Sequence, residues 1–244
     1  MSKKITLYQA LKKSGLFHSK KELSDAVNKG RITVDNVITK ALQFQFSPEK
    51  RKVCVDGKEI TFIEKKYIVM NKPTGYSCQK NDKYPYVVDI LDVPEKLKNS
   101  LFPVGRLDIQ TTGVLIITND GEFASELLVP AKKITKTYKI LLKNQITPEE
   151  LKALEKGVII EVNGLKYTTL PAKAQKSDDV IILLSITEGK FKQVRKMVEA
   201  VGNEVASLER IAIGGLNTQL QEGTWKEYNE DEIKNLIFRK NPSL

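Results

Sequence analysis

The sequence predicts an α+β protein in which a small basic N-terminal domain precedes a larger domain with a mostly antiparallel mixed sheet flanked by helices. Three observations support this fold class. The 244 residues suffice for a small domain and a medium-sized one. The positive charge is concentrated in the first quarter of the chain. Strand and helix patterns then mix without the regular strand–helix–strand period of a parallel sheet.

The distribution of charge sets the N-terminal segment apart. Residues 1–57 carry 12 Lys and Arg against 5 Asp and Glu, a net charge of +7, whereas the other 187 residues carry +3. The total of +10 by itself fits an ordinary soluble basic protein equally well. A short basic segment ahead of a nearly neutral body is more typical of a unit that binds phosphate groups.

The elements of the N-terminal segment follow from local patterns. Residues 5–14 place apolar side chains on one helical face. Residues 19–22, Ser-Lys-Lys-Glu, fit a capping box that begins a second helix, which Gly30 ends. Residues 31–35 alternate like a strand, and residues 53–60 hold another alternating segment with an Asp-Gly turn. These elements predict a compact module of two helices and a few short strands.

We place the domain boundaries at residues 1–58 for this module, 59–66 for a linker and 67–244 for the larger domain. Apolar patterns in the larger domain predict strands at 67–71, 113–118, 137–143 and 179–187. Helical periodicity predicts helices at 121–128, 148–156, 192–201 and 231–238.

Cysteine and histidine are scarce. Cys54 and Cys78 are the two cysteines and have no paired spacing, which argues against a disulfide framework or a cysteine zinc site. The single histidine, His18, lies in the N-terminal module. The larger domain therefore cannot use Ser-His or Cys-His chemistry or a conventional histidine metal site. We expect no cofactor and no metal.

The chain has no pattern that predicts a membrane protein. The N-terminal residues MSKKITLYQALKK lack the apolar core of a signal peptide. The longest apolar runs, such as residues 180–184, are far too short to span a bilayer. We expect a cytoplasmic protein.

Three residues could carry chemistry, although each also has an ordinary structural explanation. Asp108 lies in a polar, turn-prone segment directly before an apolar strand, with Arg106 nearby, but an aspartate there is more often a turn residue. Arg195 lies beside the apolar stripe of a helix, where most arginines are simply exposed. Tyr138 fits a tyrosine in the core of a strand. The residues alone leave these alternatives open.

Several short motifs occur in order along nearly the whole chain: Asn71-Lys-Pro-Thr-Gly75, Pro103-Val-Gly-Arg-Leu-Asp108, Lys136-Thr-Tyr138, Glu188-Gly-Lys-Phe-Lys-Gln-Val-Arg-Lys-Met197, Arg210-Ile-Ala-Ile-Gly214 and Leu220-Gln-Glu-Gly-Thr-Trp225. Together they resemble the RsuA family of pseudouridine synthases. Within that family, residues 156–172 are most similar to the enzyme that modifies small-subunit ribosomal RNA.

The resemblance implies an isomerase that converts uridine in RNA to pseudouridine without a cofactor. It implies that Asp108 is the catalytic carboxylate and that Arg195 keeps this carboxylate charged. It also implies that Tyr138 stacks on the uracil. Arg106 would help to hold the nucleotide outside the RNA helix.

The N-terminal segment SGLFHSKKELSDAVNKGRITVDNVIT resembles the S4-type RNA-binding domain, with Asp35-Asn36 at the usual Asn-Gly turn. This resemblance implies that Lys20, Lys21, Lys29 and Arg31 contact RNA. We expect ribosomal RNA as the partner, in the small subunit or an assembly intermediate, and a monomeric protein.

Three alternatives remain at this stage. The enzyme could act on large-subunit ribosomal RNA, or the protein could be a non-catalytic RNA-binding assembly factor. A glycoside hydrolase would need a second acid near Asp108. The candidates Asp120 and Glu122 are separated from Asp108 by a strand that spans roughly 20 Å or more.

Overall fold

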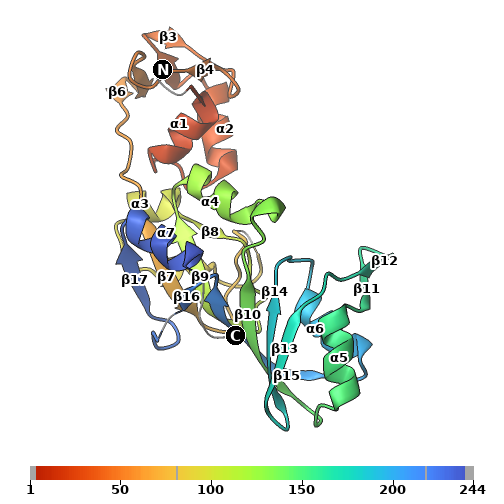
Figure 1. The fold of residues 1–244 in the computed structure, drawn as a ribbon. Coiled ribbons are helices and arrows are strands. Elements are labelled where there is room, and N and C mark those ends of the chain that lie inside the picture. Colours follow the sequence, from red (N-terminus) through yellow and green to blue (C-terminus); the bar gives the residue numbers. More distant parts are fainter. Residues whose placement is uncertain (1–3, 81, 218, 240–244) are drawn as a thin grey trace. The chain divides into compact units, whose positions relative to one another are not determined.

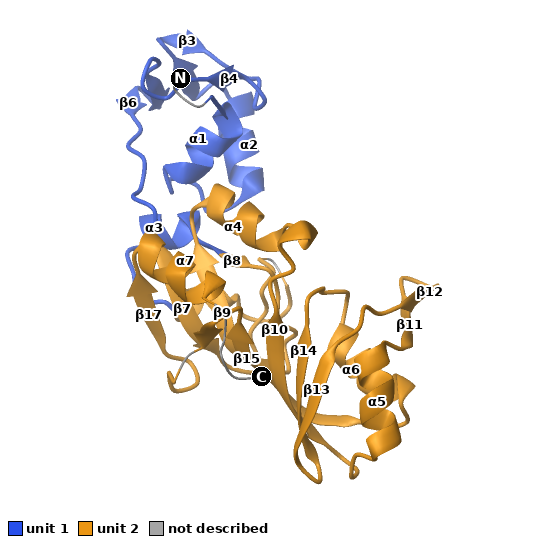
Figure 2. Cartoon of the chain, in the orientation of Figure 1, with its two compact units in different colours: residues 1–65, 91–102 blue, residues 66–90, 103–244 orange. Residues whose placement is uncertain are grey.

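The computed structural model describes residues 4–80, 82–217 and 219–239. The chain divides into two compact units, which we describe separately (Figure 2). Unit 1 comprises residues 1–65 and 91–102, and unit 2 comprises residues 66–90 and 103–244.

Two helices form one side of unit 1, and each begins at a hydroxyl cap. Helix α1 (Leu7–Lys13) has a full capping box between Thr6 and Gln9. Helix α2 (Lys20–Asn28) begins as predicted at Ser19, whose side chain accepts a hydrogen bond from the Glu22 amide. The reciprocal bond differs from a standard capping box, because the Glu22 carboxylate accepts from the amide of His18 at 2.8 Å. The Glu22 carboxylate therefore binds the amide of the residue before Ser19, rather than the Ser19 amide that a standard capping box would use.

Short antiparallel strands complete unit 1. Strands β2 (Ile32–Val34), β3 (Val37–Ile38), β5 (Val53–Val55) and β6 (Lys58–Glu59) form a sheet in the order β3-β2-β5-β6, and β1 (Ile5–Thr6) pairs with β4 (Gln45–Phe46). The predicted turns are confirmed: Asp35 and Asn36 have φ angles of 50° and 66°, and Asp56 and Gly57 have 50° and 75°. Two consecutive positive φ angles are the signature of tight hairpin turns. The helices and strands enclose a core of buried residues that includes Leu7, Leu11, Leu23, Val27, Ile32 and Phe46.

A distant segment also belongs to unit 1. Helix α3 (Glu95–Ser100), which the sequence patterns did not predict, packs beside α1. Gly15, with φ of 66°, lies so close to it that a Cβ atom would be 2.0 Å from the Lys96 carbonyl oxygen. The Lys12 ammonium lies 4.7 Å from the Phe102 ring centroid. Residues 91–102 are thus structurally part of the N-terminal unit.

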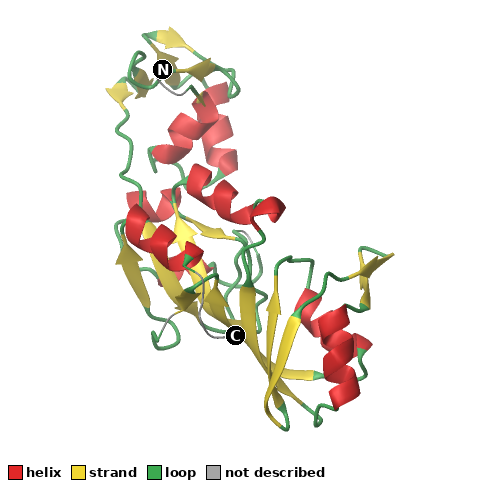
Figure 3. Ribbon diagram, in the orientation of Figure 1, coloured by secondary structure: helices red, strands yellow, loops and turns green. Residues whose placement is uncertain are grey.

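Unit 2 is built on a large mixed sheet (Figures 1 and 3). The strand order is β13-β14-β10-β15-β9-β7-β17, with β16 beside β15 and β8 beside β9. The bounds are β7 Tyr67–Lys72, β8 Phe102–Val104, β9 Thr111–Thr118, β10 Lys136–Leu142, β13 Lys173–Asp178, β14 Ile181–Ile186, β15 Val205–Ile213, β16 Leu216–Asn217 and β17 Trp225–Tyr228. The pairing of β15 with β9 is parallel, and the pairings of β7, β10, β13, β14, β16 and β17 are antiparallel. The predicted α+β fold with a mostly antiparallel mixed sheet is confirmed.

The predicted helices of unit 2 are confirmed, with bounds within a residue or so of those expected. They are α4 (Gly121–Leu128), α5 (Pro148–Lys156), α6 (Gln193–Ala200) and α7 (Glu230–Phe238), accompanied by 3₁₀ turns at Val87–Ile90 and Pro130–Lys132. Helix α5 lies against β13, and α6 lies against β15 and a separate hairpin of β11 (Ile159–Val162) and β12 (Leu165–Thr168). Among the described residues, no helix is long and apolar enough to cross a membrane.

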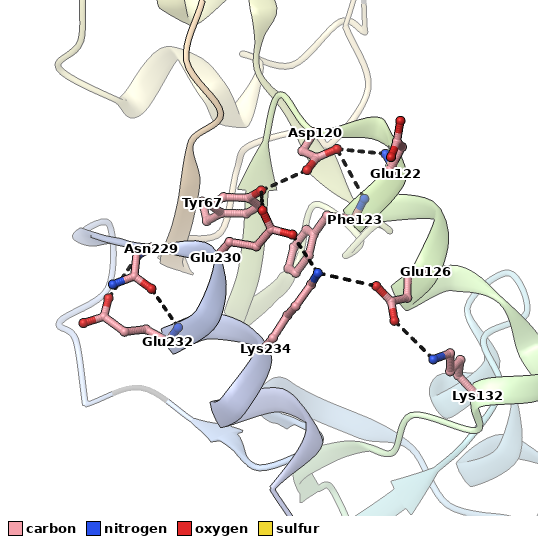
Figure 4. Close-up of polar contacts among 10 residues, drawn as sticks. All are labelled: Tyr67, Asp120, Glu122, Phe123, Glu126, Lys132, Asn229, Glu230, Glu232 and Lys234. Atoms are coloured by element: carbon pink, nitrogen blue, oxygen red, sulfur yellow. Dashed lines mark hydrogen bonds and ion pairs between the residues drawn. The ribbon is translucent and has the colours of Figure 1, made fainter. Parts of the chain in front are cut away.

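A polar network ties α7 and α4 to the start of β7 (Figure 4). The Tyr67 hydroxyl lies 2.9 Å from Asp120 Oδ2 and 2.8 Å from Glu230 Oε2. Burial and the two carboxylates raise the pKa of Tyr67 far above its usual value, so the phenol keeps its proton as a donor. Lys234 bridges from Glu230, at 2.6 Å, toward Glu126 on α4. The C-terminal helix is therefore fixed to the sheet by charge as well as by packing.

Candidate active site

The site is centred on the turn of residues 107–110, which joins β8 to β9 and carries Asp108. The backbone of this turn is held from several directions. The Leu107 amide donates to the buried Cys78 sulfur at 3.4 Å, and the Gly75 amide donates to the Ile109 carbonyl at 2.9 Å. The turn is therefore fixed by the loop after β7, while the Asp108 side chain remains partly accessible.

Lys72, the last residue of β7, supports the turn through its buried ammonium group. Its side chain is completely buried, and its ammonium donates to the carbonyl oxygens of Pro73 at 2.8 Å, Thr111 at 3.1 Å and Asp108 at 3.2 Å. Burial lowers the pKa of Lys72, and this effect is opposed by the nearby Cys78 and Asp108 groups. A buried cation satisfied by carbonyl oxygens thus binds both ends of the turn.

Arg195 reaches the same turn from a distant part of the chain. It is the third residue of α6, and its Nη2 atom donates to the Gln110 carbonyl at 3.3 Å. The structure therefore brings Arg195 to within two residues of Asp108. In the described residues, however, neither a hydrogen bond nor an ion pair joins the Asp108 carboxylate to Arg195 or Tyr138. Arg195 contacts the backbone beside Asp108 rather than the carboxylate itself.

The loop before α6 sets the position of Arg195. The buried Gln193 side chain accepts from the Lys190 amide at 2.9 Å and donates to Glu188 at 2.7 Å. Lys192 takes a left-handed conformation, with φ of 51°, at the start of the helix. Glu188 also accepts from the Leu170 amide at 2.9 Å, which links the loop to the segment after β12. The motif residues thus form one connected support for the helix start.

A row of residues crosses the sheet beside the turn. The strand registers place Lys72 opposite Gly113, Gly113 opposite Arg210, and Arg210 opposite Tyr138. Residues in adjacent register positions share a face of the sheet. A Cβ atom on Gly113, which has φ of 107°, would lie 2.2 Å from the Arg210 carbonyl oxygen. Gly113 therefore allows the close parallel contact of β9 and β15.

Arg210 is a buried cation in this row. Its Nε atom donates to the Val114 carbonyl at 2.8 Å, and its Nη2 atom has no hydrogen-bond partner among the described residues. Burial raises the pKa of Cys78, while Lys72, Arg210 and Arg106 oppose the rise. The neighbourhood of Asp108 is thus rich in positive charge.

The remaining predicted residues are also located. Arg106 is exposed, and its Nη1 atom donates to the Gln79 side chain at 3.0 Å. Lys20, Lys21 and Lys29 are exposed on and just after α2. Arg31 is also exposed, but its guanidinium is paired with Asp56, with Nε at 2.9 Å from Oδ1.

One of the acids considered for a glycosidase, Asp120, has a structural role. Asp120 is buried and caps α4 by accepting from the Glu122 and Phe123 amides. It also contacts Tyr67 in the network of Figure 4. Asp120 is therefore already engaged by α4 and Tyr67. Within the described ranges of the chain, no three His, Cys, Asp or Glu residues are grouped as a metal site would require.

The sequence patterns did not assign roles to Lys72, Cys78, Glu188 or Arg210. Lys72, Glu188 and Arg210 lie inside recognised motifs, and a lysine that ends an apolar strand before a proline was a usable signal. The contacts of Cys78 and Arg210 depend on loop closure and strand order, which no local pattern reveals.

The fold and the site define an RNA-modifying isomerase. Residues 66–200 match the family model described as RNA pseudouridylate synthase, and the chain belongs to this family. It is 40% identical over 224 residues to an uncharacterised RNA pseudouridine synthase, YtzG, of Bacillus subtilis, covering 89% of this chain and 92% of that protein.

A relative named for small-subunit ribosomal RNA confirms the resemblance to the RsuA family, and a solved structure confirms the pseudouridine synthase fold. The chain is 34% identical to the ribosomal small subunit pseudouridine synthase A of Vibrio cholerae, covering 89% of this chain and 94% of that protein. A crystal structure titled pseudouridylate synthase matches with a TM-score of 0.69 and 30% identity, covering 96% of this chain and 100% of that one.

Proposed function

We propose that this pseudouridine synthase modifies a specific uridine in small-subunit ribosomal RNA and that Asp108 is its catalytic carboxylate. The observation that carries the proposal is the turn of residues 107–110. Lys72, Gly75, Cys78 and Arg195 all bind its backbone, and the Asp108 carboxylate is the acidic side chain that the turn presents. The names of several relatives, including that of Vibrio cholerae, support the small-subunit target.

The reaction rearranges atoms that the substrate already contains. The bond between the ribose C1′ and uracil N1 breaks, the uracil turns, and C1′ bonds to C5. The proton on C5 is then lost, and N1 gains a proton. Asp108 can attack as a nucleophile or remove a sugar proton, and both roles use the ionised carboxylate. No oxidant, reductant or external group enters this balance.

Tyr138 and Arg106 are suited to binding a uridine that has been extruded from the RNA helix. A uracil inside a helix cannot reach a protein carboxylate, so it must be extruded. Tyr138 lies in the sheet row next to Arg210, where its ring can stack on the base. Arg106 is exposed two residues before Asp108, where it can contact the RNA around the extruded nucleotide. We assign Arg195 to positioning of the turn and to charge stabilisation of Asp108 in the RNA complex.

We further propose that residues 1–58 act as an S4-type RNA-binding domain, joined by residues 59–66 to a catalytic domain of residues 67–244, of which residues 91–102 pack with the N-terminal unit. The exposed lysines Lys20, Lys21 and Lys29 support this role because they present ammonium groups to solvent. Arg31 would also contact RNA, with a guanidinium group that is already paired with the Asp56 carboxylate. The enzyme would act as a monomer in the cytoplasm.

Pseudouridine mapping tests the proposal. Full-length protein is incubated with small-subunit RNA, large-subunit RNA and assembly intermediates, and new pseudouridines are located by carbodiimide modification and primer extension. We expect one new site in small-subunit RNA. A site in large-subunit RNA alone would overturn the target, and no site in any RNA would favour a non-catalytic assembly factor.

The Asp108→Asn variant tests the catalytic carboxylate in the same assay. The amide has nearly the shape of the carboxylate but no negative charge, so the backbone contacts of the turn should persist. We expect product formation to fall roughly 10²–10⁴-fold or more, with RNA affinity within about twofold of the wild type. Undiminished product would exclude Asp108 from the chemistry.

A further inference from the structure

Phe191 is an aromatic side chain that the proposed chemistry does not use. It lies in the loop before α6, four residues before Arg195, and its side chain is 54% exposed. The apolar residues that follow it in the helix, Val194 and Met197, are buried and supply the core contact of α6. Phe191 is therefore not needed to fill the core.

Two ammonium groups lie near the exposed ring. Lys192 Nζ lies 5.4 Å and Lys196 Nζ lies 5.6 Å from the Phe191 ring centroid. Lys196 also donates to the Glu161 carbonyl on β11, which fixes its position beside the ring. An exposed ring with two cations nearby is suited to a partner that combines a flat apolar face with negative charge.

The surroundings of the ring are also positive. Lys190 is exposed and lies 4.7 Å from the Tyr167 ring centroid on β12. The nearby acid, Glu188, directs its oxygens inward to Tyr167, Leu170 and Gln193. The loop therefore presents mainly ammonium groups to solvent.

We propose that Phe191 is a stacking platform for an unpaired RNA base that neighbours the target uridine, with Lys192 and Lys196 binding the adjacent phosphates. The assignment rests on the proposed function, because Arg195 joins this helix start to the turn that carries Asp108. Four residues separate Phe191 from Arg195 along the chain, a length that can span at most roughly 14 Å. A nucleotide whose base stacks on Phe191 would thus lie close to an extruded uridine. The π face of its base would contact the ring, and the adjacent phosphates would contact the two lysines.

A comparison of two short probes isolates stacking from charge. The probes are a ten-nucleotide oligouridylate and an abasic strand with the same phosphates, and affinity is measured by fluorescence anisotropy with the full chain. We expect Phe191→Ala to weaken oligouridylate binding roughly fivefold or more and to change abasic binding less than twofold. Phe191→Trp should keep the preference for the base-bearing probe.

The matched control is Phe238→Ala. Phe238 is 44% exposed and also lies beside one ammonium, that of Lys132 at 5.4 Å, but it belongs to α7. We expect this variant to bind both probes as the wild type does. An equal effect of the two substitutions, or an equal loss for both probes in Phe191→Ala, would overturn the platform.

A photo-crosslink provides an independent readout. An oligouridylate that contains 5-iodouridine should crosslink to the peptide that holds Phe191, and mass spectrometry identifies the residue. Absence of that peptide among the crosslinks would contradict the proposal even if pseudouridine is formed. Conversely, failure of the wild type to form pseudouridine would refute the proposed function while the binding results still decide the role of Phe191.

Discussion

Lys72 shows how a single buried charge can organise a catalytic turn. Its ammonium satisfies carbonyl oxygens at both ends of residues 108–111. Substitution Lys72→Met keeps the length of the side chain but leaves those oxygens without their donor. We expect the free energy of unfolding to fall by about 2–3 kcal/mol, measured by urea denaturation. Activity should fall as well, because the turn carries Asp108.

Lys139→Met is the control for this substitution. Lys139 lies on β10 in the same sheet, but its side chain is exposed. Its loss should change the free energy of unfolding by no more than about 0.5 kcal/mol. Equal destabilisation by the two variants would show that the Lys72 contacts do not support the turn.

The buried position of Lys72 also has a consequence for pH. Burial lowers its pKa below the usual value of 10.5, so in the interval between the two values the unfolded chain binds more protons than the folded chain. Stability contributed by this residue must therefore rise with pH in that interval. We expect the difference in unfolding free energy between wild type and Lys72→Met to increase as pH approaches 10.5. A difference that stays constant or shrinks would contradict the lowered pKa.

At the scale of elements, the parallel contact of β9 with β15 depends on Gly113. An alanine there would have to adopt φ near 107° and would place its Cβ against the Arg210 carbonyl. We expect Gly113→Ala to destabilise the protein by roughly 3 kcal/mol or more and to abolish activity, because the strands must separate. Thermal unfolding and the pseudouridine assay measure both effects.

The control Gly202→Ala measures the cost of a positive φ angle without the close contact that a Cβ atom would make at Gly113. Gly202 also has a positive φ, of 86°, but a Cβ there would meet no atom within 4 Å. This variant should show only the conformational cost, about 1 kcal/mol, and should remain active. If Gly113→Ala were no worse than Gly202→Ala, close packing of the two strands would not be the reason for the glycine.

The loop before α6 depends on Glu188 as a connection between elements. Its carboxylate binds the Tyr167 hydroxyl on β12 and the Gln193 side chain on α6. We expect Glu188→Ala to increase hydrogen exchange at the amides of residues 167–170 and 190–193. Glu199→Ala, an exposed position on the same helix, should leave these amides unchanged. Unaltered protection in Glu188→Ala would show that the loop is held by packing alone.

The sequence predicted the elements with strong local signals and missed those defined by pairing. Helices α4 and α5 begin directly after Asp120 and Thr147, whose side chains cap them, so their bounds could be predicted. Strand β15 was missed because Glu209 and Arg210 interrupt its apolar pattern. Arg210 is nevertheless buried in the strand, where its Nε atom donates to the Val114 carbonyl.

The candidate site was likewise predicted only in part. Asp108, Tyr138 and Arg195 were identified through motifs, and the structure places Arg195 beside the turn of Asp108. The contacts of Lys72 and Cys78 could not be predicted, since they depend on how the loop after β7 closes over that turn. The ion pair expected between Arg195 and Asp108 is not present in this structure, and the backbone contact with Gln110 occurs in its place.

At the scale of the whole molecule, residues 91–102 complicate any truncation of the N-terminal unit. Deletion of residues 1–57 would be the most direct test of RNA binding by the basic N-terminal segment. Because Gly15 packs directly against Lys96, that deletion would also strip α3 of its partner. Loss of activity in the truncated enzyme could then reflect misfolding. Substitutions on the surface of the intact protein provide a cleaner test.

The salt dependence of RNA binding provides that test. Lys20, Lys21 and Lys29 are exposed, and each phosphate contact adds about 0.7 to the slope of log affinity against log salt for single-stranded RNA. We expect the variant with all three replaced by alanine to show a slope smaller by about 2, measured between 50 and roughly 200 mM salt. The control replaces Lys139, Lys152 and Lys226, which are exposed in unit 2 and remove the same charge. An equal decrease of slope in the two variants would mean that net charge, rather than a phosphate-binding surface on α2, attracts the RNA.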